Sequence, residues 1–226
     1  MQNQLRTVNA ATGATTVRNS FVFSGGAWNP GTFVSDASGN VYAQSFDRTV
    51  YTFNALTGQV VHDVMGDTSM GQLRLSSSGQ LIGIGYDPGS MRNEVRVMNP
   101  ITGATTLLNS FTFTSGAYRP FTVSIDLTGN RLYAMASDAA LHAFDLTTGA
   151  SLPTVPADTT MDTLASDGAG GLIGISYNDA LTQFEIRTLN ALTGATAVLN
   201  TFEFDSGGYR PSSFLVDPAL NPILVT

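Results

Sequence analysis

The sequence contains no cysteine and no lysine, and only 12% of its residues are charged. The absence of cysteine excludes disulfides, thiolate metal sites and cysteine nucleophiles. All ten basic residues are arginines without a cluster, and the formal net charge is −7. A nucleic-acid-binding surface is therefore not expected, and an acidic surface without lysine also disfavours binding to anionic membranes.

Long apolar runs are also missing. No stretch reaches the roughly 18 apolar residues that a membrane-spanning helix needs, and residues 1–13 lack the basic and apolar regions of a signal peptide. The composition, rich in Asn, Thr and Gly, is similar to that of bacterial surface and secreted repeat proteins, which makes a secreted or cell-surface location a hypothesis. The chain does contain 42% hydrophobic residues in 226, enough for the core of one domain.

The sequence repeats itself about every 45 residues. Alternate units are the most alike: residues 95–113 read VRVMNPITGATTLLNSFTF, and residues 186–204 read IRTLNALTGATAVLNTFEF. The repeat is thus five units arranged as doublets of about 90 residues. A Thr-Gly pair recurs once per repeat, and its copies end at Gly13, Gly58, Gly103, Gly149 and Gly194.

Within each unit, short runs of alternating apolar and polar residues are bounded by Gly, Asp, Asn and Pro, a pattern that predicts β-strands. Four antiparallel strands in about 45 residues are typical of one β-propeller blade. We therefore expect an all-β fold, a five-bladed β-propeller of four-stranded antiparallel blades that forms a single domain over residues 1–226. In the first complete unit the predicted strands are residues 32–35, 41–46, 49–54 and 59–64.

The two ends of the chain complement each other. Residues 221–226 align with the second strand of a blade, and residues 4–9 align with the third. We therefore expect the N- and C-terminal strands to pair and to close the ring, so that no sheet edge stays exposed there. Two alternatives stay open: the chain is an excised or engineered part of a longer array, or two chains complete a larger ring. The oligomeric state is not predicted.

The blades resemble those of a known family. Residues 126–138 (DLTGNRLYAMASD), followed by residues 141–149 (LHAFDLTTG), resemble the blade motif of quinoprotein-like (PQQ-type) β-propellers, and residues 35–58 are similar. The resemblance implies the fold and not the cofactor, because quinone-dependent members dock their blades through a Trp in the fourth strand, whereas Trp28 lies in a predicted loop. No cofactor is expected. Size and plan also resemble the five-bladed tachylectin type of sugar-binding propeller.

One segment occurs three times, at residues 21–30 (FVFSGGAWNP), 111–120 (FTFTSGAYRP) and 202–211 (FEFDSGGYRP). We call it the crossing segment, because it leads from the fourth strand of one blade to the first strand of the next. Its aromatic residue either packs between blades or stacks on a sugar or another flat ligand, while Arg or Asn binds hydroxyls or a carboxylate. The candidate ligand-binding residues are Trp28, Asn29, Tyr118, Arg119, Tyr209 and Arg210.

Acidic residues follow the second strand of several blades, at the blade end that also carries the crossing segments. Asp47 and Asp138 are candidates for ligand binding around a central channel, although an Asp at such a place also caps a hairpin with its own side chain. His62 and His142 occupy different repeat positions and have no second ligand at metal spacing, so no metal site is predicted. No catalytic residue is assigned.

These patterns favour a non-enzymatic binding module for a carbohydrate or another small polar ligand, with several weak sites that act together. The alternative is a structural or protein–protein interaction scaffold of a surface or secreted protein. A glycoside hydrolase-like enzyme with an acidic central pocket is the third hypothesis. It is less favoured because the only three Glu occupy mid-blade or outer positions.

Overall fold

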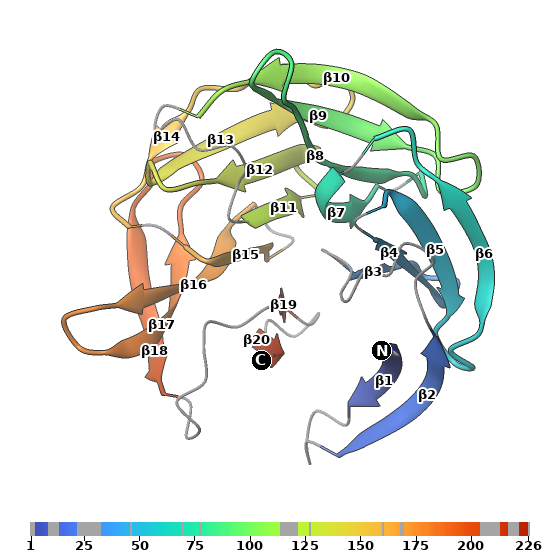
Figure 1. Cartoon of the computed structure of the whole chain (residues 1–226). Coiled ribbons are helices and arrows are strands. Elements are labelled where there is room, and N and C mark those ends of the chain that lie inside the picture. The colour runs from blue at the N-terminus through green and yellow to red at the C-terminus, as the bar shows by residue number, and fades with distance from the viewer. Residues whose placement is uncertain are drawn as a thin grey trace. The chain divides into compact units, whose positions relative to one another are not determined.

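The structure is a computed structural model that describes residues 3–8, 14–21, 33–45, 47–68, 70–76, 78–113, 122–126, 128–159, 161–167, 170–203, 213–216 and 222–225. All secondary-structure elements within these ranges are β-strands. The described strands form four sheets of four antiparallel strands and two separate strand pairs (Figure 1). The prediction of an all-β fold built from four-stranded antiparallel blades is confirmed.

Each blade follows the order of the chain from its first to its fourth strand. The first blade contains β3 (Phe33–Ser35), β4 (Asn40–Gln44), β5 (Thr49–Asn54) and β6 (Val60–Met65). The second contains β7 (Met70–Leu75), β8 (Leu81–Asp87), β9 (Arg92–Met98) and β10 (Thr105–Phe111). The third contains β11 (Thr122–Asp126), β12 (Arg131–Met135), β13 (Ala140–Asp145) and β14 (Val155–Pro156). The fourth contains β15 (Thr163–Ser166), β16 (Leu172–Asn178), β17 (Gln183–Leu189) and β18 (Thr196–Phe202).

The two remaining strand pairs come from the ends of the chain. β1 (Asn3–Val8) pairs with β2 (Thr15–Phe21), and β19 (Ser213–Val216) pairs with β20 (Pro222–Val225). The chain divides into two compact units, residues 1–87 with 94–107 and residues 88–93 with 108–226, and the two pairs belong to different units. The fold is consistent with a five-bladed β-propeller, and the pairing of the two ends into the fifth blade stays a prediction.

Strand alternation gives every blade two ends. Strands one and two, and strands three and four, are joined at what we call the turn end, and strands two and three are joined at the hairpin end. At the turn end, Asp36 accepts hydrogen bonds from the backbone N–H groups of Ser38 (2.9 Å) and Asn40 (2.8 Å). Asn54 accepts two further backbone N–H groups at 3.0 and 2.9 Å. Three residues equivalent to Asn54 do the same: Asn99, Asp145 and Asn190.

The glycine of the repeated Thr-Gly pair contacts the outer strand that precedes its own blade. Gly58, Gly103, Gly149 and Gly194 have φ angles of 73°, 72°, 72° and 76°, in the left-handed region that favours glycine. A Cβ at Gly58 would lie 2.7 Å from the Cβ of Asn19 on β2, and at the other three it would lie still closer to the outer edge of the preceding blade. Each turn therefore rests against the fourth strand of the preceding blade, or against its end, where only glycine fits.

The hydrophobic cores also lie between consecutive blades. In the first unit, Tyr42 and Val50 of the first blade pack with Leu73 and Leu81 of the second. The β1–β2 pair packs against the first blade in the same way, through Leu5 and Phe21. In the second unit the corresponding cluster joins the third and fourth blades, and its large side chains are Tyr133, Met135, Leu141, Met161, Leu164, Leu172 and Leu189. The blade ends are thus held on rigid, well-packed sheets.

Candidate functional site

The six candidate residues of the crossing segments, Trp28, Asn29, Tyr118, Arg119, Tyr209 and Arg210, lie outside the described residues, and their role stays a prediction. The start of the second crossing segment is described. Phe111 and Phe113 are 8% and 3% exposed, and their rings lie 4.6 Å from Phe144 and 4.9 Å from His142, both on β13 of the next blade. The two phenylalanines therefore anchor the beginning of this segment against β13.

The predicted ligand-binding residues Asp47 and Asp138 lie in the hairpins of the first and third blades. The Asp47 carboxylate accepts a hydrogen bond from the Ser45 hydroxyl and one from the Thr49 N–H at 3.1 Å. The Asp138 carboxylate accepts the N–H of Ala140 at 3.2 Å. The next residue in each hairpin has a positive φ, 76° and 52°, a tight turn that an Asp side chain stabilises. Both residues cap their hairpins, which is one of the two predicted roles, and their ligand role stays a prediction.

The two histidines are engaged in separate structural contacts. His142 Nε2 lies 3.4 Å from the Asp138 carboxylate, and its ring packs against Phe111 and Phe113. His62 Nε2 lies 2.9 Å from the carbonyl oxygen of Ile101 and donates to it. Among the described residues, no group of three or more His, Cys, Asp or Glu could hold a metal ion. In the same part of the chain, no helix is long and apolar enough to cross a bilayer.

The fourth blade contains a polar network that sequence reasoning missed. Glu185 accepts hydrogen bonds from Asn178 Nδ2 and Arg187 Nε, each at 2.7 Å, and Arg187 Nη1 donates to Thr196 Oγ1 at 2.8 Å. Thr196 in turn donates its hydroxyl (2.6 Å) and its backbone N–H (3.2 Å) to the two carboxylate oxygens of Asp158. This Glu-Arg-Thr-Asp network joins strands three and four of the blade to the segment that enters it from the third blade.

Hydrogen bonding shifts the acidities of this network. The hydrogen bond from Asn178 is the main cause that lowers the pKa of Glu185, with Arg187 adding to it. The hydrogen bond from Thr196 lowers the pKa of Asp158, and the charge of Arg187 acts in the same direction. Both acids are therefore held as carboxylates. Because they already accept structural hydrogen bonds, they are poorly suited to act as a general acid.

The second blade has the same network in the first unit. Arg96 donates to Glu94 (2.7 Å) and to Thr105 Oγ1 (2.8 Å), and Thr105 donates its hydroxyl (2.6 Å) and its N–H (2.9 Å) to Asp67. Burial raises the pKa of Asp67, but the hydrogen bonds from Thr105 outweigh it, and the pKa is lowered overall. The signal that could have found the network is the identical spacing of Glu, Arg and Thr in both blades.

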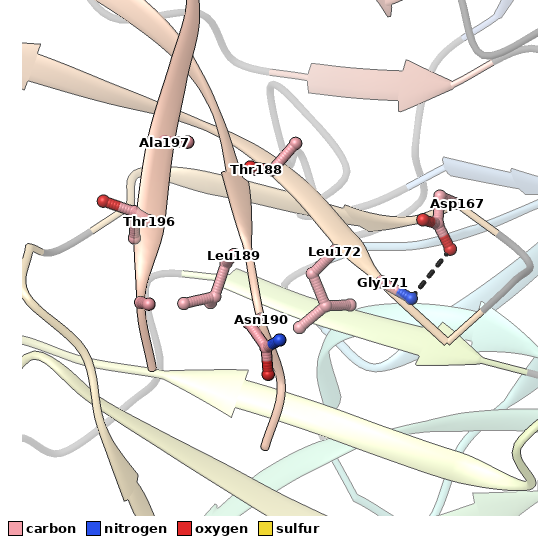
Figure 2. A pocket seen from close by; sticks show the side chains of 9 residues that line it. Asp167, Gly171, Leu172, Thr188, Leu189, Asn190, Thr196 and Ala197 are labelled. Atoms are coloured by element: carbon pink, nitrogen blue, oxygen red, sulfur yellow. Dashed lines mark hydrogen bonds between the residues drawn. The ribbon is translucent and has the colours of Figure 1, made fainter. Parts of the chain in front are cut away.

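The fourth blade also carries a cavity of about 310 Å3 at its turn end. Figure 2 shows Leu172 and Leu189 beside each other, with Asp167 bonded to the backbone N–H of Gly171 at 2.9 Å. The other lining residues are Thr188, Asn190, Ala195, Thr196 and Ala197. The side-chain oxygen of Asn190 accepts two turn N–H groups, and Thr196 binds Asp158. The cavity is thus mainly apolar and lies at the opposite end of the blade from the crossing segments.

Comparisons with known proteins bear on the fold. No protein-family model and no curated protein matches the chain. A chain in the crystal structure of the Mitotic Checkpoint Complex is similar in structure, with a TM-score of 0.58, 14% sequence identity and 91% of this chain covered. The present chain spans 60% of that chain's length. At this identity the likeness concerns the fold alone, and together with the four blades it shows that the protein is a β-propeller of four-stranded antiparallel blades.

Proposed function

We propose that the protein is a non-enzymatic binding module for a carbohydrate or another small polar ligand, which it binds at the hairpin ends of its blades. The observation that carries this proposal is the contrast between the two blade ends. The turn ends repeat the same hydrogen bonds and the same glycine contacts from blade to blade. The hairpin ends vary, and a variable loop on a rigid scaffold is the usual place for a binding site.

The hairpins show this variation directly. In the first and third blades they are short and capped by Asp47 and Asp138. In the second and fourth blades the two hairpin strands are seven residues long, and Met91 and Leu181 near their tips are 68% and 57% exposed. The crossing segments begin at this same end, because each follows a fourth strand. Their Tyr and Arg residues supply the stacking and charged groups that a sugar or a carboxylate ligand needs.

The test is a thermal-shift screen of the full chain with a panel of mono- and oligosaccharides, since a ligand that binds the folded state raises Tm. The double variant Tyr118→Ala with Tyr209→Ala should lose the shift of any sugar that binds. The control is Leu56→Ser with Leu192→Ser, which changes exposed residues of the turn end only and should keep the shift. A shift that survives the tyrosine changes would overturn this assignment of the site.

One observation favours a second function, a protein-interaction scaffold. Leu56, Ile101 and Leu192 occupy equivalent positions at three turn ends and are 73%, 63% and 75% exposed. Repeated exposed aliphatic side chains suit a protein partner better than a sugar. The structurally similar chain also comes from a protein complex. Replacing all three residues by Glu should abolish binding of a purified partner, and the tyrosine double variant should bind it normally.

A further inference from the structure

The Glu-Arg-Thr-Asp network of the second and fourth blades has a third, incomplete counterpart in the β1–β2 pair. Gln4, Arg6 and Thr15 have the same spacing along the sequence as the Glu, Arg and Thr of the two complete networks. Their hydrogen bonds are also the same: Arg6 Nε donates to the Gln4 side-chain oxygen at 2.9 Å, and Arg6 Nη1 donates to Thr15 Oγ1 at 2.9 Å. The three residues are exposed.

In the complete networks the threonine is a two-point donor to a carboxylate. Thr105 holds Asp67, and Thr196 holds Asp158, each through the hydroxyl and the backbone N–H. The arginine behind the threonine donates to its hydroxyl oxygen and so directs the hydroxyl proton towards the carboxylate. The lowered pKa values of both aspartates agree with a site that favours the charged form.

The third counterpart differs in two ways. Among the described residues, no carboxylate accepts a hydrogen bond from Thr15. In addition, Gln4 is neutral where the other two sets have Glu94 and Glu185, so within the described part of the chain Arg6 forms no ion pair of the kind that Arg96 and Arg187 form. The set of Gln4, Arg6 and Thr15 thus carries one positive charge in a protein whose formal net charge is −7. Both differences favour a bound anion at Thr15.

We propose that Thr15, supported by Arg6, is a binding site for a carboxylate, namely the Asp side chain of a peptide segment presented by a protein ligand. The Thr15 hydroxyl and N–H donate to the two oxygens, and Arg6 supplies the charge. Both complete networks hold an Asp from a segment that reads Asp-Thr-Ser-Met or Asp-Thr-Thr-Met, which indicates the ligand that fits. The site lies at the turn end of its strands, whereas the carbohydrate site is proposed at the hairpin ends.

The experiment is an NMR titration of the 15N-labelled full chain with the peptide acetyl-Asp-Thr-Ser-Met-amide. The Thr15 amide resonance should shift and saturate, with weak affinity because the site is exposed. The Thr105 and Thr196 amides are internal references and should not move, since their carboxylates are already in place. The same peptide with Asn in place of Asp should bind at least about tenfold more weakly, because a charge-assisted hydrogen bond is lost.

Variants of Arg6 and Thr15 distinguish the loss of a ligand contact from a nonspecific change in the β1–β2 hairpin. Arg6→Gln and Thr15→Val should each weaken binding by about tenfold, whereas Thr15→Ser keeps both donors and should bind like the original chain. Equal binding of the Asp and Asn peptides, or no movement of Thr15, overturns the proposal. It is also overturned if the Thr15 amide of the peptide-free chain already titrates with a carboxylic acid, because a carboxylate of the chain itself then fills the site.

Discussion

The contacts between consecutive blades alternate between two kinds. At aromatic junctions, Phe21 of β2 packs 4.6 Å from Phe53, and Phe111 of β10 packs 4.6 Å from Phe144. At carboxylate junctions, Asp67 binds Thr105, and Asp158 binds Thr196. Each of these four junctions lies within one unit. The repeat of about 90 residues in the sequence follows from this alternation, because two blades are needed to pass through both kinds of junction.

The two kinds of junction are held by different forces, and both also contain the same glycine contact. The aromatic junction depends on apolar burial, which does not depend on pH, whereas the carboxylate junction depends on charged hydrogen bonds. The glycine contact of the Thr-Gly turn is common to both, since Gly103 meets Met65 at a carboxylate junction and Gly149 meets Leu108 at an aromatic one.

The largest effect is expected from the glycine contact that both kinds of junction share. Gly103→Ala and Gly149→Ala should each lower the free energy of unfolding by about 4 kcal/mol, because strain at a positive φ adds to a clash with the preceding blade. Gly79→Ala is the matched control: its φ is 77°, but nothing lies within 4 Å of the added Cβ. It should cost only about 1 kcal/mol in urea unfolding. Equal losses at Gly79 and Gly103 would show that the blade contact contributes nothing.

The aromatic junction should give the next largest effect. Phe111→Ala removes a buried ring between Phe113 and Phe144 and should lower the free energy of unfolding by about 3 kcal/mol. The loss should change less between pH 7 and pH 3 than the effect of Asp158→Asn does, although the ring also contacts His142. Val198→Ala on the exposed face of β18 is the control and should change stability by less than about 0.5 kcal/mol. A loss at Phe111 that grows at either pH would mean that the ring acts through a titrating neighbour.

The carboxylate junction should respond to pH instead. Asp158→Asn should lower the free energy of unfolding at pH 7 by about 1 kcal/mol, since the group is exposed and solvent screens it. Its folded pKa is lowered, chiefly by the hydrogen bond from Thr196, so the stabilisation is complete above the unfolded pKa and is lost as pH falls through the folded value. Urea unfolding at pH 7 and pH 3 should therefore show a difference between variant and original chain that shrinks in acid.

A pH-independent loss for Asp158→Asn would contradict the carboxylate junction as described. Thr196→Ser is its matched control, because it keeps both donors to Asp158. This variant should stay within about 0.5 kcal/mol of the original chain at either pH. Phe111→Ala, measured in the same buffers, provides the less pH-sensitive reference for the other kind of junction.

Much of the fold could be predicted because local patterns determine it. The predicted strand at residues 49–54 coincides with β5, since alternating residues and turn signals at both ends are local. The fourth strand of the third blade is reduced to Val155–Pro156, with one isolated bridge between Phe144 and Ser151. Pro153 and Pro156 explain the reduction, because proline has no N–H for the ladder.

The candidate sites were harder to predict. The hairpin-cap role of Asp47 and Asp138 depends on where the carboxylate points, which the hairpin geometry shows and the sequence does not, and their ligand role stays a prediction. The Glu-Arg-Thr-Asp network was missed because its Asp and Thr are 38 residues apart in the sequence. Only the packing of one blade on the next brings them together. The Arg–Thr spacing was visible, but a spacing alone does not tell a network from three unrelated surface residues.

The smallest effect on stability is expected when Arg6 of the β1–β2 pair is given an acidic partner. Gln4→Glu gives Arg6 the acidic partner that Arg96 and Arg187 already have, and an exposed ion pair of this kind should stabilise the chain by only about 0.3 kcal/mol. Gln4→Glu should change the affinity of the proposed carboxylate site more than it changes stability, since the added charge repels the ligand and neutralises Arg6. The NMR titration should then show severalfold weaker binding of the Asp peptide at Thr15, with unchanged Thr105 and Thr196 resonances. Binding that is unaffected by Gln4→Glu would mean that the charge of Arg6 does not act on the ligand, and that hydrogen bonds from Thr15 alone hold it.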